Sequence, residues 1–226
     1  MEHVFDAIGV SLPMALGIAA SPSPVIAMLI LLMTRRARSN ALFFLTGWFS
    51  GLLMVGLLTL FGVGFLGGFS DGSSHSGILR MILGMLFLVL AVPIARQIPR
   101  KGQQPAPPGW LDKLDQFGFP QSFAFGFFFS VPNLKNASLV VTGMTGVLPY
   151  QLDPAVAIFV LFLFSLIASA GVLVPPVLYL LFGERATTVF GGMKIWLIRN
   201  RALILFLILL VFGVLWLLQG LALRRL

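Results

Sequence analysis

One lysine and two neighbouring amides form the group of side chains best suited to bind a ligand in this sequence. Lys135 lies between Asn133 and Asn136, in the middle third of a long apolar segment, residues 119–147. If that segment crosses a membrane, a lysine at this depth costs about 2.5–3.5 kcal/mol by insertion scales, which makes it a candidate functional residue. The alternative is that the segment begins later and the Lys135 side chain extends to the nearer interface.

Lys135 has no obvious acidic partner. The seven acidic residues fall near the ends of apolar segments or in the connections between them: Glu2, Asp6, Asp71, Asp112, Asp115, Asp153 and Glu184. The remaining partners are backbone carbonyls freed by helix breaks, side-chain oxygens such as that of Asn133, or an anion from outside the protein. A phosphate, sulfate or carboxylate on an amphiphile would supply the missing charge, with neutral hydrogen bonds from four residues: Asn133, Asn136, Ser21 and Ser23.

Helix-breaking residues recur at matching positions in the two halves of the chain. The stretch "ALGIAASPSP", from Ala15, aligns with "AFGFFFSVPN", from Ala124, at a constant offset that also pairs Ser21 with Ser130. Pro22 and Pro24 follow the first serine, and Pro132 follows the second. Paired broken helices that meet near the middle of the bilayer form the binding sites of many secondary transporters. The alternative is that these prolines only kink packed helices.

The elements that must position these residues are membrane-spanning helices. Of the 226 residues, 58% are hydrophobic and 10% are charged, and the mean hydropathy is +1.02. Such a composition is typical of an all-α integral membrane protein. Six apolar segments predict six transmembrane helices, near residues 8–33, 41–66, 77–95, 119–147, 153–182 and 202–222. We expect Pro175 and Pro176 to bend the fifth of them.

The six segments divide the chain into two similar halves. Residues 1–98 form a first three-helix repeat and residues 119–226 a second, with broken first and fourth helices. Three spans per half place the second copy upside down in the bilayer, which is an inverted repeat. Between them, residues 99–118 are rich in Pro and Gly and predict a cytoplasmic linker with a short interfacial helix. The segment around Phe190 and Trp196 is predicted to lie on the membrane surface.

Small residues at four-residue spacing predict close packing between helices. Gly47 and Gly51 form one such pair in the second segment, and Ser165 and Ser169 form another in the fifth.

The basic residues indicate an orientation. Although the net charge is +8, most of the lysines and arginines follow the first and third segments or lie between the fifth and sixth, while Arg224 and Arg225 follow the sixth and argue against the orientation below. By the positive-inside rule these three connections are cytoplasmic, and both termini lie outside a plasma membrane. Contact with anionic headgroups accounts for most of the basic excess, so no nucleic-acid partner is expected.

Residue types and positions argue against catalysis and against a bound cofactor. The chain has no cysteine, which removes thiolate metal sites and dithiol redox chemistry. His3 and His75 both lie outside the apolar segments, so the sequence predicts no metal site. No Ser/His/Asp or paired-carboxylate set lies within reach of the membrane interior. We therefore expect no catalytic residues, no enzyme activity and no cofactor.

Three stretches carry a resemblance to a known family. The N-terminal "SLPMALGIAASPSPVIAMLILL", the following "RRARSNALFFLTGW", and the Pro132 to Asn136 segment resemble the GAP family. These are glycopeptidolipid- and sulfolipid-addressing membrane proteins of mycobacteria and relatives, grouped with the lysine-exporter superfamily. The resemblance implies a six-span protein of an actinobacterial plasma membrane that exports envelope glycolipids or supports their export.

Residues and resemblance together favour one function and leave two alternatives. The favoured hypothesis is a translocator of an anionic or sugar-bearing cell-envelope lipid, with Lys135 as the headgroup anchor. The alternatives are an exporter of amino acids or other small solutes, and a non-transporting scaffold for a lipid export or synthesis complex. The expected partners are membrane lipids, an anionic amphiphilic substrate, and a second copy of the chain or a larger envelope-lipid export complex.

Overall fold

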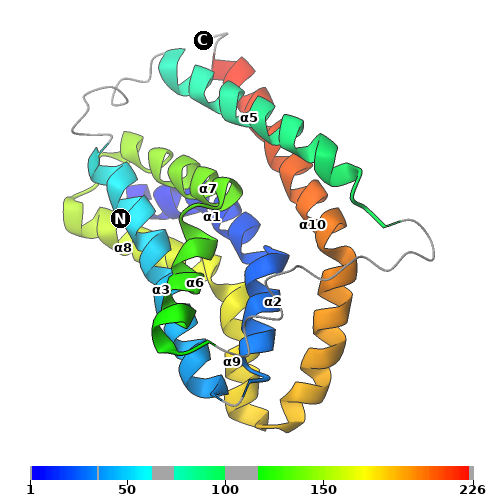
Figure 1. The fold of residues 1–226 in the computed structure, drawn as a ribbon. Coiled ribbons are helices and arrows are strands. Elements are labelled where there is room, and N and C mark those ends of the chain that lie inside the picture. The colour runs from blue at the N-terminus through cyan, green and yellow to red at the C-terminus, as the bar shows by residue number, and fades with distance from the viewer. Residues whose placement is uncertain (1, 35, 63–73, 100–116, 224–226) are drawn as a thin grey trace.

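The computed structural model describes residues 2–34, 36–62, 74–99 and 117–223. In these ranges every regular element is a helix (Figure 1). The elements are α1 (Glu2–Ala19), α2 (Pro22–Leu31), α3 (Ala37–Leu57) with a π-helical end η1 (Leu58–Gly62), α5 (Ser74–Ala95), α6 (Phe119–Ser130), α7 (Leu134–Thr145), the 3₁₀ turn η3 (Leu148–Tyr150), α8 (Pro154–Ala168), α9 (Ala170–Phe182) and α10 (Arg185–Leu223).

The helices are those of a membrane protein. Two stretches, Ala37–Gly62 and Arg185–Leu221, are long and apolar enough to cross a membrane alone. Two bent pairs, α1 with α2 and α8 with α9, meet the same test when each is taken as one span. The all-α membrane class is therefore confirmed. The six-span count and the inverted repeat stay predictions, because α6 and α7 have only 12 residues each, about 18 Å of helix against about 30 Å of hydrocarbon.

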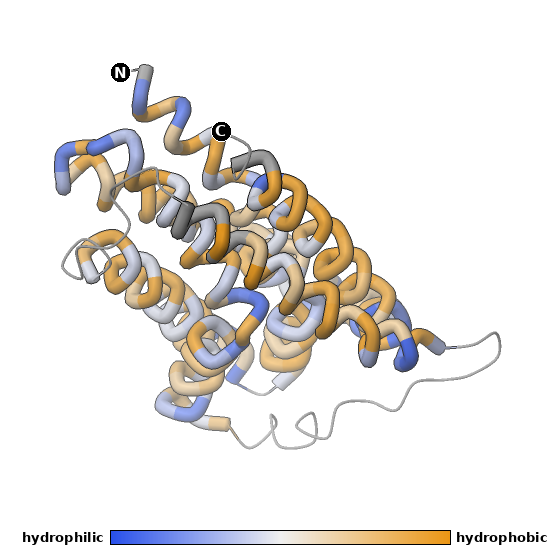
Figure 2. The backbone as a smooth tube through the Cα atoms, turned by 90° about the horizontal axis from the view of Figure 1, so that it is seen from above, coloured by the Kyte–Doolittle hydropathy of each residue, from blue (hydrophilic) through white to orange (hydrophobic). Residues whose placement is uncertain are grey.

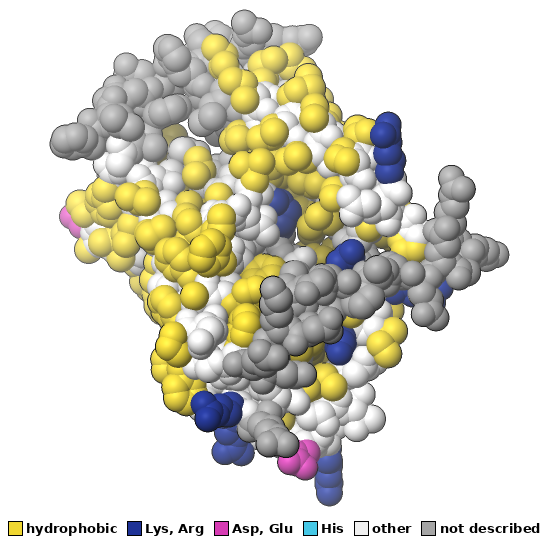
Figure 3. All heavy atoms as spheres, viewed as in Figure 1, with side chains coloured by type: hydrophobic (Ala, Val, Ile, Leu, Met, Phe, Trp, Pro, Cys, Tyr) yellow, Lys and Arg dark blue, Asp and Glu magenta, His cyan; other side chains and the backbone are white. Residues whose placement is uncertain are grey.

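The surface supports the same class. Figure 2 shows hydrophobic residues along most of the helical tube, and Figure 3 shows hydrophobic side chains over broad areas of one face. Individual apolar side chains are strongly exposed, among them Leu181 at 71%, Leu180 at 69% and Ile195 at 68%. Such a surface is suited to lipid, since a large contiguous apolar patch is rare on a soluble monomer.

The fifth segment bends at a different place from the one predicted. Its helix is interrupted at Ser169, where α8 and α9 meet at 63°, while Pro175 and Pro176 lie buried inside α9. The prediction placed the bend at the prolines, but the structure places it at Ser169, six residues before Pro175 and beyond the one turn that a proline distorts.

The segment before the sixth span is part of a long helix. The amphipathic segment around Phe190 and Trp196 is continuous with the last span in the 39-residue helix α10, and its predicted location on the membrane surface stays a prediction. Nothing between Arg185 and Leu223 breaks this helix, since it contains no proline. At 1.5 Å per residue its 39 residues correspond to about 58 Å of helix, which is more than one crossing of about 30 Å of hydrocarbon needs. The predicted interfacial helix and most of the linker, residues 100–116, lie outside the described residues.

Glycines let α3 and α6 pack closely. A Cβ atom on Gly47 would overlap the Phe123 carbonyl, and one on Gly126 would overlap the Phe44 carbonyl. The predicted packing role of Gly47 is thereby confirmed. Ser169 also lies in a contact between helices, because its hydroxyl accepts a 3.1 Å hydrogen bond from the indole of Trp48.

Basic residues gather where several connections meet. The α2–α3 connection and the α9–α10 junction lie at the lower end of Figure 1, close to the start of α6. Arg36, Arg38 and Arg185 belong to this end, and all three are exposed. The side of a membrane to which this end belongs, and the outside location of both termini, stay predictions.

Candidate functional site

The break between α1 and α2 is formed by residues that suit a helix start. Pro22 occupies the first position of α2, where a backbone N–H would have no helical partner. Ser21 precedes it in an extended conformation, and the two helices meet at 54°. The prolines therefore begin a new helix in a new direction, and the predicted break in the first segment is confirmed.

This break frees one carbonyl. In a continuous α-helix the N–H of Ser21 would bond to the Gly17 carbonyl, but here it donates to the carbonyl of Ile18 at 2.9 Å. The Gly17 carbonyl is thus available to another donor inside the protein.

The second break separates α6 from α7 at residues 131–133. Asn133 caps α7, because its side-chain oxygen accepts a 3.4 Å hydrogen bond from the backbone N–H of Asn136. This geometry explains why an asparagine stands there, since the first N–H groups of a helix need a side-chain acceptor. Lys135 and Asn136 follow in the first turn of α7.

The two breaks meet in a buried polar group that we call the Lys135 cluster, consisting of Gly17, Ser21, Lys135 and Asn136. The ammonium group of Lys135 donates to the Ser21 hydroxyl at 2.6 Å and to the Gly17 carbonyl at 3.1 Å. The Ser21 hydroxyl donates in turn to the Asn136 side-chain oxygen at 3.2 Å. The amide nitrogen of Asn136 donates to the Phe129 carbonyl, in the last turn of α6, at 3.1 Å.

Burial makes the cluster electrostatically unusual. The exposed fraction is 6% for Lys135, 2% for Ser21 and 0% for Asn136. Both partners that the structure gives the ammonium group are neutral. A buried cation is normally paired with a negative charge, and none of the described residues gives Lys135 such a partner. An ammonium group has three N–H donors, of which two are used here.

The structure places the other predicted site residues elsewhere. Ser130 donates to the Phe127 carbonyl and lies against Gly51, so it belongs to the contact between α3 and α6. Pro132 is exposed, Pro22 and Pro24 are buried in the first turn of α2, and Ser23 is half-buried. The cluster thus contains three of the predicted residues, Ser21, Lys135 and Asn136.

One member of the cluster was not predicted by name. Gly17 contributes through its carbonyl, and the only signal for it was the general expectation that a helix break frees backbone acceptors. Gly17 aligns with Gly126 in the matching stretch of the second half, but Gly126 lies in the contact between α3 and α6 instead.

These features define a class: a helical membrane protein in which two helix breaks enclose a buried lysine. Residues 12–222 match the family model described as Sap, sulfolipid-1-addressing protein, and the chain belongs to that family. The resemblance inferred from the sequence is thereby confirmed, and the match covers both breaks. Neither the curated proteins nor the solved structures contain a match to this chain.

Proposed function

We propose that this protein translocates an anionic or sugar-bearing lipid of the cell envelope across the plasma membrane, with Lys135 as the headgroup anchor. The family name supports a role with sulfolipids, whose sulfate is an anion. The observation that carries the proposal is a buried ammonium group whose partners among the described residues are the Ser21 hydroxyl and the Gly17 carbonyl.

The charges in the described residues favour an external anion. The acidic side chains whose surroundings are described, Asp6, Asp153 and Glu184, are exposed and lie near helix ends. None of them belongs to the Lys135 cluster. A sulfate, phosphate or carboxylate would bring the charge that the described residues do not provide, and charge-assisted hydrogen bonds to it are stronger than neutral ones.

The breaks support movement of such a group. Non-helical backbone at membrane depth is tolerated where it is buried in protein or lines a cavity, and it can reorient more readily than a continuous helix. Ser21 and Lys135 belong to different breaks, so a headgroup bound at Lys135 contacts both bent segments at once. The acyl chains meanwhile remain on the apolar outer surface.

The test is lipid translocation by the purified protein in vesicles. A sulfated glycolipid with a fluorescent acyl chain is placed in one leaflet, and its arrival in the other is followed with a membrane-impermeant quencher. We expect Lys135→Met to lower the rate by about tenfold or more, since loss of a charged hydrogen bond is worth about 1.5–3 kcal/mol. Lys194→Met is the matched control, because Lys194 lies in α10 outside the cluster.

Each alternative outcome has a distinct meaning. A wild-type rate in folded Lys135→Met would refute the anchor role, and equal rates for the sulfated lipid and an uncharged analogue would refute the anionic substrate. Transport of a free amino acid by the purified protein would instead indicate a small-solute exporter. Stable co-purification with an export or synthesis complex, without transport by the isolated protein, would indicate a scaffold.

A further inference from the structure

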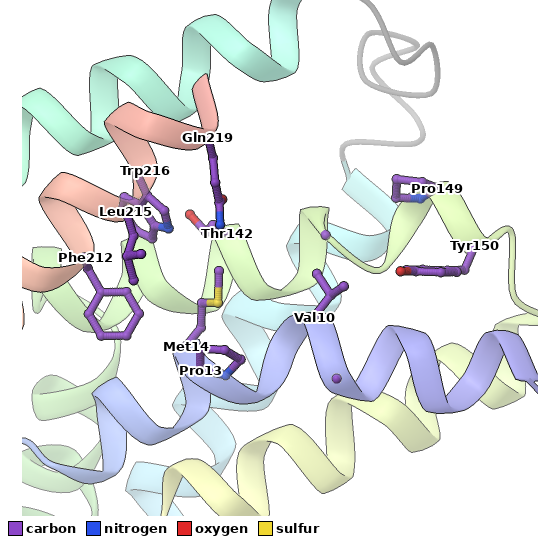
Figure 4. A pocket seen from close by; sticks show the side chains of 12 residues that line it. Val10, Pro13, Met14, Thr142, Pro149, Tyr150, Phe212, Leu215, Trp216 and Gln219 are labelled. Carbon is purple, nitrogen blue, oxygen red and sulfur yellow. The ribbon is translucent and has the colours of Figure 1, made fainter. Parts of the chain in front are cut away.

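A pocket lies between α1, α7, η3 and α10, and none of its lining residues belongs to the Lys135 cluster. Its volume is about 540 Å³, which lies within the range of about 300–1,000 Å³ that is common for small-molecule sites. Figure 4 shows side chains from these elements around it. The lining residues include Val10, Met14, Thr142, Phe212 and Trp216.

Two buried polar atoms in this pocket have no hydrogen-bond partner among the described residues. They are the hydroxyl oxygen of Thr142, a residue that is 5% exposed, and the indole nitrogen of Trp216, which is 0% exposed. In Figure 4 both polar ends, together with the amide of Gln219, point toward the same region. Leaving a buried polar group unpaired is costly, so a hydrogen-bond acceptor that enters the pocket and reaches these two atoms would be favoured.

The lining residues restrict the chemistry of that group. No lining residue is charged, so the ligand group is neutral. The Trp216 indole can only donate, so the ligand group must accept, and the Thr142 hydroxyl can donate to the same atom. Val10, Met14 and Phe212 provide apolar walls on either side. An acceptor with an apolar chain attached fits these conditions.

The pocket borders an apolar surface. Leu215 lines it and is 42% exposed, and Leu218 and Leu221 further along α10 are 59% and 47% exposed. In a membrane protein such side chains contact acyl chains. An acyl chain that lies on this surface would therefore be next to the pocket.

We propose that this pocket binds the ester-linked acyl part of a lipid, with Trp216 and Thr142 donating hydrogen bonds to an ester carbonyl. This inference goes beyond the proposed function, because it concerns a neutral site that shares no side chain with the Lys135 cluster. One face of α7 carries Lys135, Leu139 and Thr142 at helical spacing, so the two sites lie on the same side of that helix.

The ligand comparison uses two neutral lipids that differ only in the carbonyl groups. The full-length protein in detergent micelles is titrated with dimyristoylglycerol, an ester, and with its di-O-tetradecyl ether, and binding is measured by native mass spectrometry. We expect the wild type to prefer the ester by about fivefold to tenfold, which corresponds to about 1–1.4 kcal/mol. Equal affinity of the wild-type protein for the two lipids would by itself overturn the proposal.

Two variants then locate the preference. Trp216→Phe removes the indole N–H, and Thr142→Val removes the hydroxyl with little change of shape. Each variant should therefore bring the ratio of ester affinity to ether affinity closer to one. Trp48→Phe is the matched control, because the Trp48 indole is already bonded to Ser169 outside the pocket. A preference that persists in both pocket variants would overturn the proposal.

The same assay separates this proposal from the proposed function. Lys135→Met should leave the ester preference unchanged, because the diacylglycerol carries no anion. Loss of the preference in that variant would contradict two independent sites.

Discussion

Ser21 links the two helix breaks, and replacing it tests how much the Lys135 cluster stabilises the fold. Its hydroxyl accepts from Lys135 at 2.6 Å and donates to Asn136 at 3.2 Å. Ser21→Ala removes both bonds, one worth about 1.5–3 kcal/mol because it involves a charge and one worth about 0.5–1.5 kcal/mol. Together they predict a loss of about 3 kcal/mol in the free energy of unfolding.

Ser23 provides the matched control in the same break. It is half-buried, and the structure gives its side chain no hydrogen bond among the described residues. Ser23→Ala should therefore change the free energy of unfolding by no more than about 0.5 kcal/mol. Thermal unfolding in micelles measures both, and Ser21→Ala should lower the midpoint by about 6–12 °C if its loss is about 3 kcal/mol. Equal shifts for the two variants would refute the reasoning.

Two further predictions concern packing and orientation. Gly126→Ala should destabilise the protein by about 1–3 kcal/mol, because the added Cβ overlaps the Phe44 carbonyl. Gly191→Ala is the control and should be neutral or stabilising, because a Cβ there meets nothing within 4 Å. Similar thermal midpoints for the two variants would contradict this prediction. Single cysteines at Ser39 and Gln151, in a chain without cysteine, should react with an impermeant reagent from opposite sides of the membrane. Labelling from one side would refute the orientation.

The sequence was enough to predict that the two breaks meet, but not which side chains bond to each other where they meet. Pro22 marks a helix start by its backbone chemistry, and Lys135 marks a polar site by its cost in a membrane, so both are visible from residue type alone. Which serine bonds to Lys135 depends on the direction in which α2 leaves the break, and that direction is set by packing. Ser130 matched Ser21 in the sequence, yet its hydroxyl is used within α6.

Other parts of the structure had no local signal. The bend at Ser169 is stabilised by its bond to Trp48, a residue more than a hundred positions away in the chain. The pocket likewise joins Val10 in α1, Thr142 in α7 and Trp216 in α10. Contacts between residues so distant in sequence have no periodicity by which they can be recognised.

Gly17 borders both proposed sites. Its carbonyl accepts a hydrogen bond from Lys135, and its Cα faces the ring of Phe212, which lines the pocket. A Cβ added at Gly17 would lie 2.6 and 2.7 Å from two ring carbons of Phe212. The Phe212 ring packs edge-on against Trp216, with ring centroids 6.2 Å apart, so displacing the first ring displaces the second. Such overpacking costs about 1–3 kcal/mol, which exceeds the gain of about 1 kcal/mol that alanine brings to a helix.

We therefore expect Gly17→Ala to weaken dimyristoylglycerol binding severalfold, although it removes no polar group from the pocket and leaves the Gly17 carbonyl in place. Gly192→Ala is the control, because a Cβ there meets nothing within 4 Å. Adding Phe212→Leu to Gly17→Ala should restore part of the affinity, since a smaller side chain relieves the overlap. Unchanged binding in folded Gly17→Ala would show that the Phe212 ring can move without affecting the pocket, and would refute this reasoning.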